Sequence, residues 1–164
     1  MKVYIYERGQ KEITKLCEEV LINRGLIISD RPHGSDIAVA PWLDRLIPAA
    51  EIDIYNIGVL IFHPSLLPAY RGKSAIKDAF KNGDTYSGIT WFWAAKGYDT
   101  GDICAQAVLP ITEPSPREFY ERKVIPAAVI LLRLISDDLK RGRVIKRKQN
   151  IFDEVIKTGE LQAL

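Results

Sequence analysis

The sequence has few residues of the kinds that mark secreted, membrane or metal-binding proteins. Its two cysteines, Cys17 and Cys104, are too few for a disulfide framework and form no Cys-x-x-Cys pair. No apolar run approaches the ~18 residues of a transmembrane helix, and the N-terminal apolar stretch is too short for a signal peptide. The formal net charge is only +2, which favours neither nucleic acid nor a membrane as partner. We therefore expect a cytoplasmic protein, and its oligomeric state stays open.

Common catalytic and nucleotide-binding motifs are also missing. There is no P-loop pattern, no G-x-G-x-x-G and no G-x-S-x-G. Residues 140–148 are basic but contain no aromatic residue, which is more typical of a solvated helix end than of a nucleic-acid surface. Asp99 and Asp102 are three residues apart, but no His, Cys or further acid lies at ligand spacing. We therefore expect no metal site.

Strand-like and helical patterns alternate along the chain. Hydrophobic residues make up 47% of the 164 residues and charged residues 27%, as in ordinary globular domains. The expected strands are residues 2–6, 26–29, 36–41, 58–63, 86–94 and 102–111, with a further candidate at 144–148. The expected helices are a first one ending at Gly25, a short one at 74–81, and a long one that is capped by Ser115, kinked at Pro126 and ends near Arg141.

This order predicts an α/β fold. We expect an open, Rossmann-like and mostly parallel sheet, with helices on both faces and a late antiparallel hairpin. Residues 1–150 should form a single domain, followed by a C-terminal tail at 151–164. In such sheets the ligand site lies beyond the carboxyl ends of the central strands.

His63 lies at such a strand end. It closes an apolar strand and leads directly into Pro64-Ser-Leu-Leu-Pro68, a stiff loop that would hold the ring in place for acid–base work. The alternative is a histidine that only bonds a nearby backbone carbonyl, and the local pattern leaves both open. The other histidine, His33, lies in a turn and is a weaker candidate.

Asp99 lies in a polar loop, residues 96–102, that contains two glycines. A carboxylate near a histidine can fix its tautomer and favour its protonated form. The alternative is plain turn chemistry, because Asp and Gly are common in turns.

Three segments together resemble the folate-dependent formyltransferase family in order and spacing: residues 63–72 (HPSLLPAYRG), 88–90 (GIT) and 99–103 (DTGDI). The family uses 10-formyltetrahydrofolate and includes methionyl-tRNA, glycinamide ribonucleotide and nucleotide-sugar formyltransferases. The stretch 40–45 (APWLDR) also resembles the formyltransferase-like part of a hydrogenase-maturation protein. The resemblance implies a formyltransferase fold, no metal, and His63 and Asp99 as catalytic residues. Its implied folate-binding residues are Arg45, Leu46, Ile47, Lys96, Gly97 and Tyr98.

The chain departs from the family pattern at Ile61. The family has an asparagine there, whose amide donates to the formyl oxygen. Residues two apart in a strand face the same side, so Ile61 would present a methyl group beside His63. Losing one such donor typically costs ~10²–10³ in rate. Members of the family usually have a further strand–helix unit before the histidine strand and a glycine-bearing first loop. Both look reduced in this chain.

Three functions therefore stay open. The first is transfer of a formyl group from 10-formyltetrahydrofolate to an amine acceptor, such as a sugar or another small molecule. The second is a formyl hydrolase, and the third is a folate- or ligand-binding module without turnover. We expect the folate side of the site to be better preserved than the acceptor side.

Overall fold

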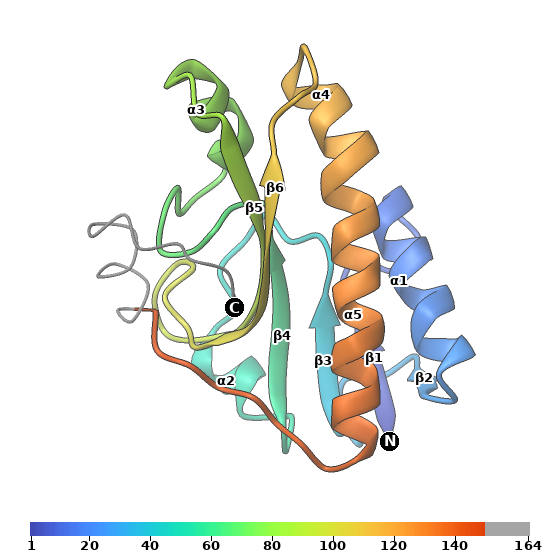
Figure 1. The fold of residues 1–164 in the computed structure, drawn as a ribbon. Helices are drawn as coiled ribbons and strands as arrows, with labels where there is room; N and C mark the ends of the chain where they lie inside the picture. Colours follow the sequence, from blue (N-terminus) through green and yellow to red (C-terminus); the bar gives the residue numbers. More distant parts are fainter. Residues whose placement is uncertain (150–164) are drawn as a thin grey trace.

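The computed structural model describes residues 1–149, in which six strands form one sheet (Figure 1). The strand order is β2-β1-β3-β4-β5-β6. The strands are β1 (Lys2–Ile5), β2 (Ile27–Ser29), β3 (Ile37–Ala40), β4 (Gly58–His63), β5 (Tyr86–Trp93) and β6 (Ile103–Pro110). The first four pair in parallel, whereas β4–β5 and β5–β6 are antiparallel. The predicted fold class is confirmed.

The helices cover the two faces of the sheet unequally. They are α1 (Glu12–Asn23), α2 (Ala49–Ile52), α3 (Ala75–Lys81), α4 (Pro116–Phe119) and α5 (Ile125–Lys140). The long helices α1 and α5 pack side by side on one face (Figure 1). Within residues 1–149, the other face is covered by α2 and connecting loops. Within residues 1–149, no helix combines the length and the apolar character needed to span a bilayer.

Two hydrophobic clusters, one on each face, bury the central strands. In strand β3, for example, all four residues are buried. Ile37 and Val39 join the cluster under α1 and α5, and Ala38 and Ala40 join the cluster on the other face. This division follows from the alternation of side chains along a strand. Since the alanines are small, the loops on that face can pack close to the sheet.

The predicted long helix starts as expected but is interrupted earlier than expected. Ser115 caps it, because its Oγ accepts a hydrogen bond from the Glu118 N–H at 3.2 Å. A single π-helical turn, Tyr120–Val124, then separates α4 from α5. Pro126 has no N–H to donate into this preceding turn, which accounts for the wider turn there. The sequence therefore located the disturbance within a few residues but predicted a kink at Pro126 instead of a π-helical turn before it.

The structure also differs from the sequence-based expectations in two smaller elements. The candidate strand at 144–148 is reduced to one antiparallel bridge between Ile103 and Arg147. The four-residue helix α2 was not predicted, because so short a segment has no periodicity to detect. The predicted tail at 151–164 lies outside the described residues.

Candidate functional site

A cavity of about 210 Å³ lies beyond the carboxyl end of β4, and we call it the His63 cavity. Segments far apart in the sequence line it. All but one of the residues selected from the sequence are among its lining residues: Arg45, Leu46, Ile47, Ile61, His63, Gly97, Tyr98 and Asp99. Lys96 is the exception. The structure thus brings this set together, while the role of each residue remains a prediction.

His63 is held by a contact at each ring nitrogen. The side chain is buried, and Nε2 lies 2.8 Å from the carbonyl oxygen of Tyr70. A carbonyl can only accept, so Nε2 carries the hydrogen and donates it. The other nitrogen, Nδ1, lies 3.6 Å from Oδ2 of Asp99. Both partners considered from the sequence, a nearby backbone carbonyl and a carboxylate, are therefore present at once.

Asp99 is fixed by contacts to its carboxylate and to its backbone. Its Oδ2 accepts a hydrogen bond of 2.8 Å from the Gly72 N–H. Its carbonyl accepts hydrogen bonds from Nε2 of Gln149 at 2.7 Å and from Nε of Arg71 at 3.2 Å. Its φ is +51°, in the left-handed region that non-glycine residues seldom occupy. Such a conformation persists only where the surroundings impose it, which indicates that the carboxylate is positioned.

The loop after His63 is tied to the antiparallel strands through Thr90. The Thr90 hydroxyl donates to the Ser65 carbonyl at 2.7 Å and accepts from the Leu67 N–H at 3.1 Å. It also accepts from Nε2 of Gln106 at 2.8 Å. Thr90 lies on β5 and Gln106 on β6, so the late hairpin supports the position of the catalytic candidate.

Several of these supporting residues were not identified from the sequence. Thr90 and Arg71 fall inside the segments that carried the family resemblance, and their motif position could have marked them. Gln106 and Gln149 lie in no motif, and no local pattern marks either one. Only the folded chain brings them to the loops that they hold.

The predicted folate-binding residues differ in their surroundings. Ile47 is buried, whereas Leu46 and Tyr98 are exposed at the rim. The Arg45 guanidinium is already paired with Glu51, at 2.8 Å from Nη2 to Oε2 and 3.2 Å from Nη1 to Oε1. Arg45 therefore offers less free charge to a ligand than its sequence position suggested.

The lining gives the cavity a mixed chemistry. Apolar side chains such as Ile61 and Phe92 form part of its wall, and the buried His63 and the partly buried Asp99 supply titratable groups. Within residues 1–149, no cluster of three or more His, Cys, Asp or Glu side chains has the arrangement of a metal site. The arrangement suits proton transfer next to a flat, largely apolar ligand.

A family model described as formyl transferase matches residues 16–134, well over half of the chain. Methionyl-tRNA formyltransferase from Elusimicrobium minutum is 31% identical over 121 residues, which cover 73% of this chain and 36% of that protein. Cytosolic 10-formyltetrahydrofolate dehydrogenase from Xenopus tropicalis is 40% identical over 98 residues, 58% of this chain and 11% of the relative.

Solved structures show the same similarity. HypX from Aquifex aeolicus, crystallised in complex with tetrahydrofolic acid, superposes with a TM-score of 0.76 at 25% identity, over 90% of this chain and 28% of that one. Phosphoribosylglycinamide formyltransferase from Bacillus halodurans superposes with a TM-score of 0.71 at 20% identity, over 87% of this chain and 97% of that one, which shows a shared fold. The chain thus spans only 11% and 36% of the two curated relatives described above.

Proposed function

The chain belongs to the formyl transferase family, and on this premise we propose that its His63 cavity binds the pterin end of 10-formyltetrahydrofolate for formyl transfer to an amine. The observation that carries the proposal is the placement of His63 and Asp99, 3.6 Å apart, in one cavity at a strand end. The tetrahydrofolic acid bound to HypX, a protein of similar structure, supports it further.

The size and lining of the cavity fit one part of such a ligand. Pockets that enclose a whole drug-sized ligand measure ~300–1,000 Å³. At about 210 Å³, the His63 cavity suits a flat bicyclic ring, with the rest of the molecule outside. Exposed Trp42 and Tyr98 are among the lining residues and offer aromatic surface to the part that extends outward.

The chain's own residues would position the reacting groups and handle the proton. When bound, 10-formyltetrahydrofolate supplies a formyl group that passes from its nitrogen to the acceptor amine. Because Nε2 already donates to Tyr70, His63 would need its charged form to present an Nδ1–H to the formyl oxygen, where negative charge develops. Asp99 would hold the ring and accept the amine's proton directly or through one water. The 3.6 Å separation leaves room to shorten, as catalytic contacts often do once substrate binds.

Ile61 favours a second candidate function, folate binding without turnover. Its side chain lines the cavity together with His63, where it offers no hydrogen-bond donor. Without that donor, transfer should be slower by ~10²–10³ than in a site that has one. A hydrolase with water as acceptor would need the same His63–Asp99 pair.

Calorimetry with a stable 10-formyltetrahydrofolate analogue tests binding, and consumption of 10-formyltetrahydrofolate with and without amines tests turnover. We expect the wild-type chain to bind the analogue. Ile61→Trp should not bind it, because the larger side chain fills the cavity. We expect Asp99→Asn to bind the analogue but to turn over at least ~10²-fold more slowly. We expect His63→Ala to slow turnover at least as much as Asp99→Asn does, and His33→Ala, in an exposed turn, is its matched control. No binding by the folded wild-type chain would overturn the proposal, and binding without turnover would establish the second candidate.

A further inference from the structure

The loop that follows His63 turns back so that its residues 70–72 contact both catalytic candidates. The carbonyl of Tyr70 accepts the hydrogen of His63 Nε2 at 2.8 Å. Two residues further on, the Gly72 N–H donates to Oδ2 of Asp99 at 2.8 Å. Because one short piece of backbone holds an atom of each side chain, its position sets how His63 and Asp99 face each other.

Tyr70 has an unusual backbone conformation at this point. Its φ of +54° is in the left-handed region, which bulky non-glycine residues seldom occupy. Such a conformation persists only where the surroundings impose it. The peptide before Tyr70 is held from within the loop, because the Ser65 hydroxyl donates to the Ala69 carbonyl at 2.6 Å. The side chain of Tyr70 provides a second hold.

The Tyr70 hydroxyl bonds residues at the end of helix α3. It donates to Oδ2 of Asp84 at 2.6 Å and accepts from Nδ2 of Asn82 at 2.9 Å. The bond to the Asp84 carboxylate raises the pKa of the Tyr70 hydroxyl, so this hydroxyl stays a donor near neutral pH. Hydrogen bonds to an ionised acceptor are stronger than neutral ones, which makes Asp84 the firmer of the two partners.

Asp84 is itself held in place by the end of α3. The Gly83 N–H donates to the Phe80 carbonyl and the Asp84 N–H donates to the Ala79 carbonyl, each at 3.1 Å. The φ of Gly83 is +71°, as is usual where a helix ends at a glycine. Ala79 is fully buried, so this end of the helix is packed against the rest of the protein. Tyr70 therefore ties the loop to a fixed point on α3.

We propose that Tyr70 is a positioning residue for His63. Its carbonyl holds the hydrogen on Nε2, its side chain fixes that carbonyl through Asp84, and Nδ1 is thereby left to face Asp99. Without this anchor, a neutral ring can carry its hydrogen on either nitrogen. Among the described residues, the lining of the His63 cavity includes neither Tyr70 nor Asp84, so Tyr70 acts through His63 and not on a ligand. The inference rests on the proposed function, which gives His63 a part in the reaction.

Nitrogen-15 NMR of the histidine rings tests this role without folate and without turnover. The sequence contains two histidines, so the spectrum has two rings, and exposed His33 is the internal reference. At a pH where the rings are neutral, we expect wild-type Nε2 of His63 to show the shift of a protonated nitrogen and Nδ1 that of a bare one. Tyr70→Phe keeps the aromatic ring and loses the hydroxyl. We expect it to move the two His63 shifts toward each other, because the other tautomer becomes populated.

Substitutions of Asp84 test the same hydrogen bond from its other end. Asp84→Ala removes the acceptor and should reproduce the shifts of Tyr70→Phe. Asp84→Asn keeps an acceptor oxygen and should keep the wild-type shifts. The double variant Tyr70→Phe/Asp84→Ala should move the shifts no further than either single variant, because both substitutions remove one and the same interaction.

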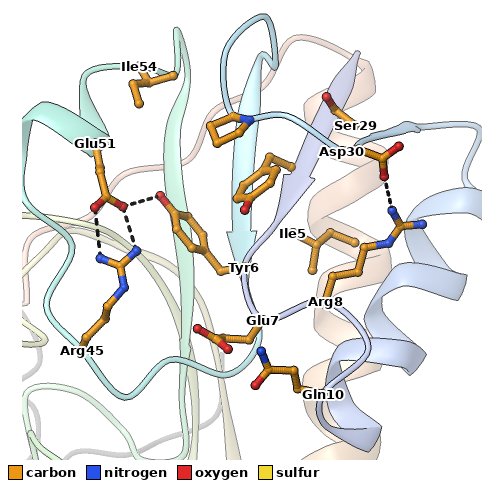
Figure 2. Close-up of a pocket in the computed structure, with 12 residues that line it drawn as sticks. Ile5, Tyr6, Glu7, Arg8, Gln10, Ser29, Asp30, Arg45, Glu51 and Ile54 are labelled. Carbon is orange, nitrogen blue, oxygen red and sulfur yellow. Dashed lines mark hydrogen bonds and ion pairs between the residues drawn. The ribbon is translucent and has the colours of Figure 1, made fainter.

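Tyr6→Phe is the matched control for the NMR experiment. Figure 2 shows the Tyr6 hydroxyl bonded to Glu51, and this contact, at 3.2 Å, also joins a tyrosine to a carboxylate. The polar contacts of the His63 ring are instead to Tyr70 and Asp99. Tyr6→Phe should therefore leave the His63 shifts unchanged.

Turnover shows whether the position of the ring matters to the reaction. We expect Tyr70→Phe to lower kcat for 10-formyltetrahydrofolate ~10-fold and to change KM less than ~2-fold, because the folate contacts stay in place. Asp84→Asn should keep kcat within ~2-fold of the wild-type value. Tyr86→Phe, at an exposed tyrosine of β5, should leave both constants unchanged.

The positioning role is overturned if Tyr70→Phe and Asp84→Ala, shown by melting curves to be folded, keep the wild-type His63 shifts, or if Tyr6→Phe moves these shifts as far. A higher KM with unchanged kcat in Tyr70→Phe would also overturn it, and would leave Tyr70 a role in loop stability alone. Absence of turnover by the wild-type chain would contradict formyl transfer and not this role, because the NMR outcome needs no substrate.

Discussion

Ile61 and His63 lie two residues apart on β4, and both side chains line the His63 cavity. Ile61→Asn places an amide donor beside His63, and we expect turnover of 10-formyltetrahydrofolate to rise by up to ~10²-fold. The gain should stay below that of an evolved site, because no neighbouring groups orient the new amide. Since Ile61 is only half-buried, the amide can meet water in the cavity, and the stability cost should be about 1 kcal/mol.

Ile61→Leu is the matched control for this substitution. Leucine has nearly the shape of asparagine but has no donor, so it should leave turnover unchanged. Turnover assays measure the gain in rate from the added donor, and thermal melting measures the loss of stability. If Ile61→Asn melts lower yet turns over no faster than the same variant carrying His63→Ala, the missing amide does not limit the reaction, and folate binding without turnover becomes the better account.

The two thiols should be inert in the folded protein. Cys17 and Cys104 are buried, and burial raises the pKa of each from 9.0 to about 12. The thiolate is the reactive form, so neither should react with Ellman's reagent at pH 8 until a denaturant unfolds the chain. A thiol that titrates rapidly under native conditions would contradict this burial.

The same raised pKa values predict a loss of stability in alkali. The folded state holds the two thiol protons more tightly than the unfolded state, so their contribution to stability is complete below pH ~9 and declines as the pH rises toward 12. Urea unfolding at pH 8 and pH 10 measures the decline. The double variant Cys17→Ala/Cys104→Ala should lose less stability between these two pH values than wild type does.

The hairpin of β5 and β6 holds the loop that follows His63. Thr90 is fully buried, and Thr90→Val keeps its shape while removing the hydroxyl that bonds Ser65, Leu67 and Gln106. Because the Leu67 N–H then lacks its acceptor, we expect a loss of ~1–3 kcal/mol in the free energy of unfolding. Folate-analogue binding should weaken as well, since the loop begins at His63.

Thr85→Val provides the control, because Thr85 is exposed just before β5. Its effect on stability should stay within ~0.5 kcal/mol. Urea unfolding measures both variants. Equal urea midpoints for Thr90→Val and Thr85→Val would mean that the hairpin does not support the loop.

The helical layer that buries most of the core lies apart from the His63 cavity. Leu132 on α5 is fully buried under the helical face of the sheet, whereas Leu134 on the same helix is 55% exposed. Leu132→Ala should lower the free energy of unfolding by ~2–5 kcal/mol, because it leaves a cavity in the core. Leu134→Ala should change it by no more than ~0.5 kcal/mol.

Both leucine variants should bind the folate analogue like wild type at temperatures where they are folded, because neither residue lines the His63 cavity. Calorimetry below the melting temperature tests this. Loss of binding in folded Leu132→Ala alone would show that the helical layer is coupled to the site.

Features that depend on neighbours along the chain could be predicted from the sequence. Apolar runs predicted the six strands, and Ser115 with Pro116 predicted a helix start that the structure has at that position. The motif segments selected His63 and Asp99, whose roles remain predictions. Each of these signals lies within a few residues, because helix caps, strand alternation and turns are local.

The tertiary structure was needed to show which distant groups meet. It placed Gln149 against the Asp99 loop, paired Arg45 with Glu51, and assembled the His63 cavity from segments far apart in the sequence. It also explains Gly101, which the sequence marked only as a turn residue: a side chain there would meet the Trp93 carbonyl at 1.6 Å. Such contacts depend on how the chain closes over long sequence separations, and no periodicity or local motif records that closure.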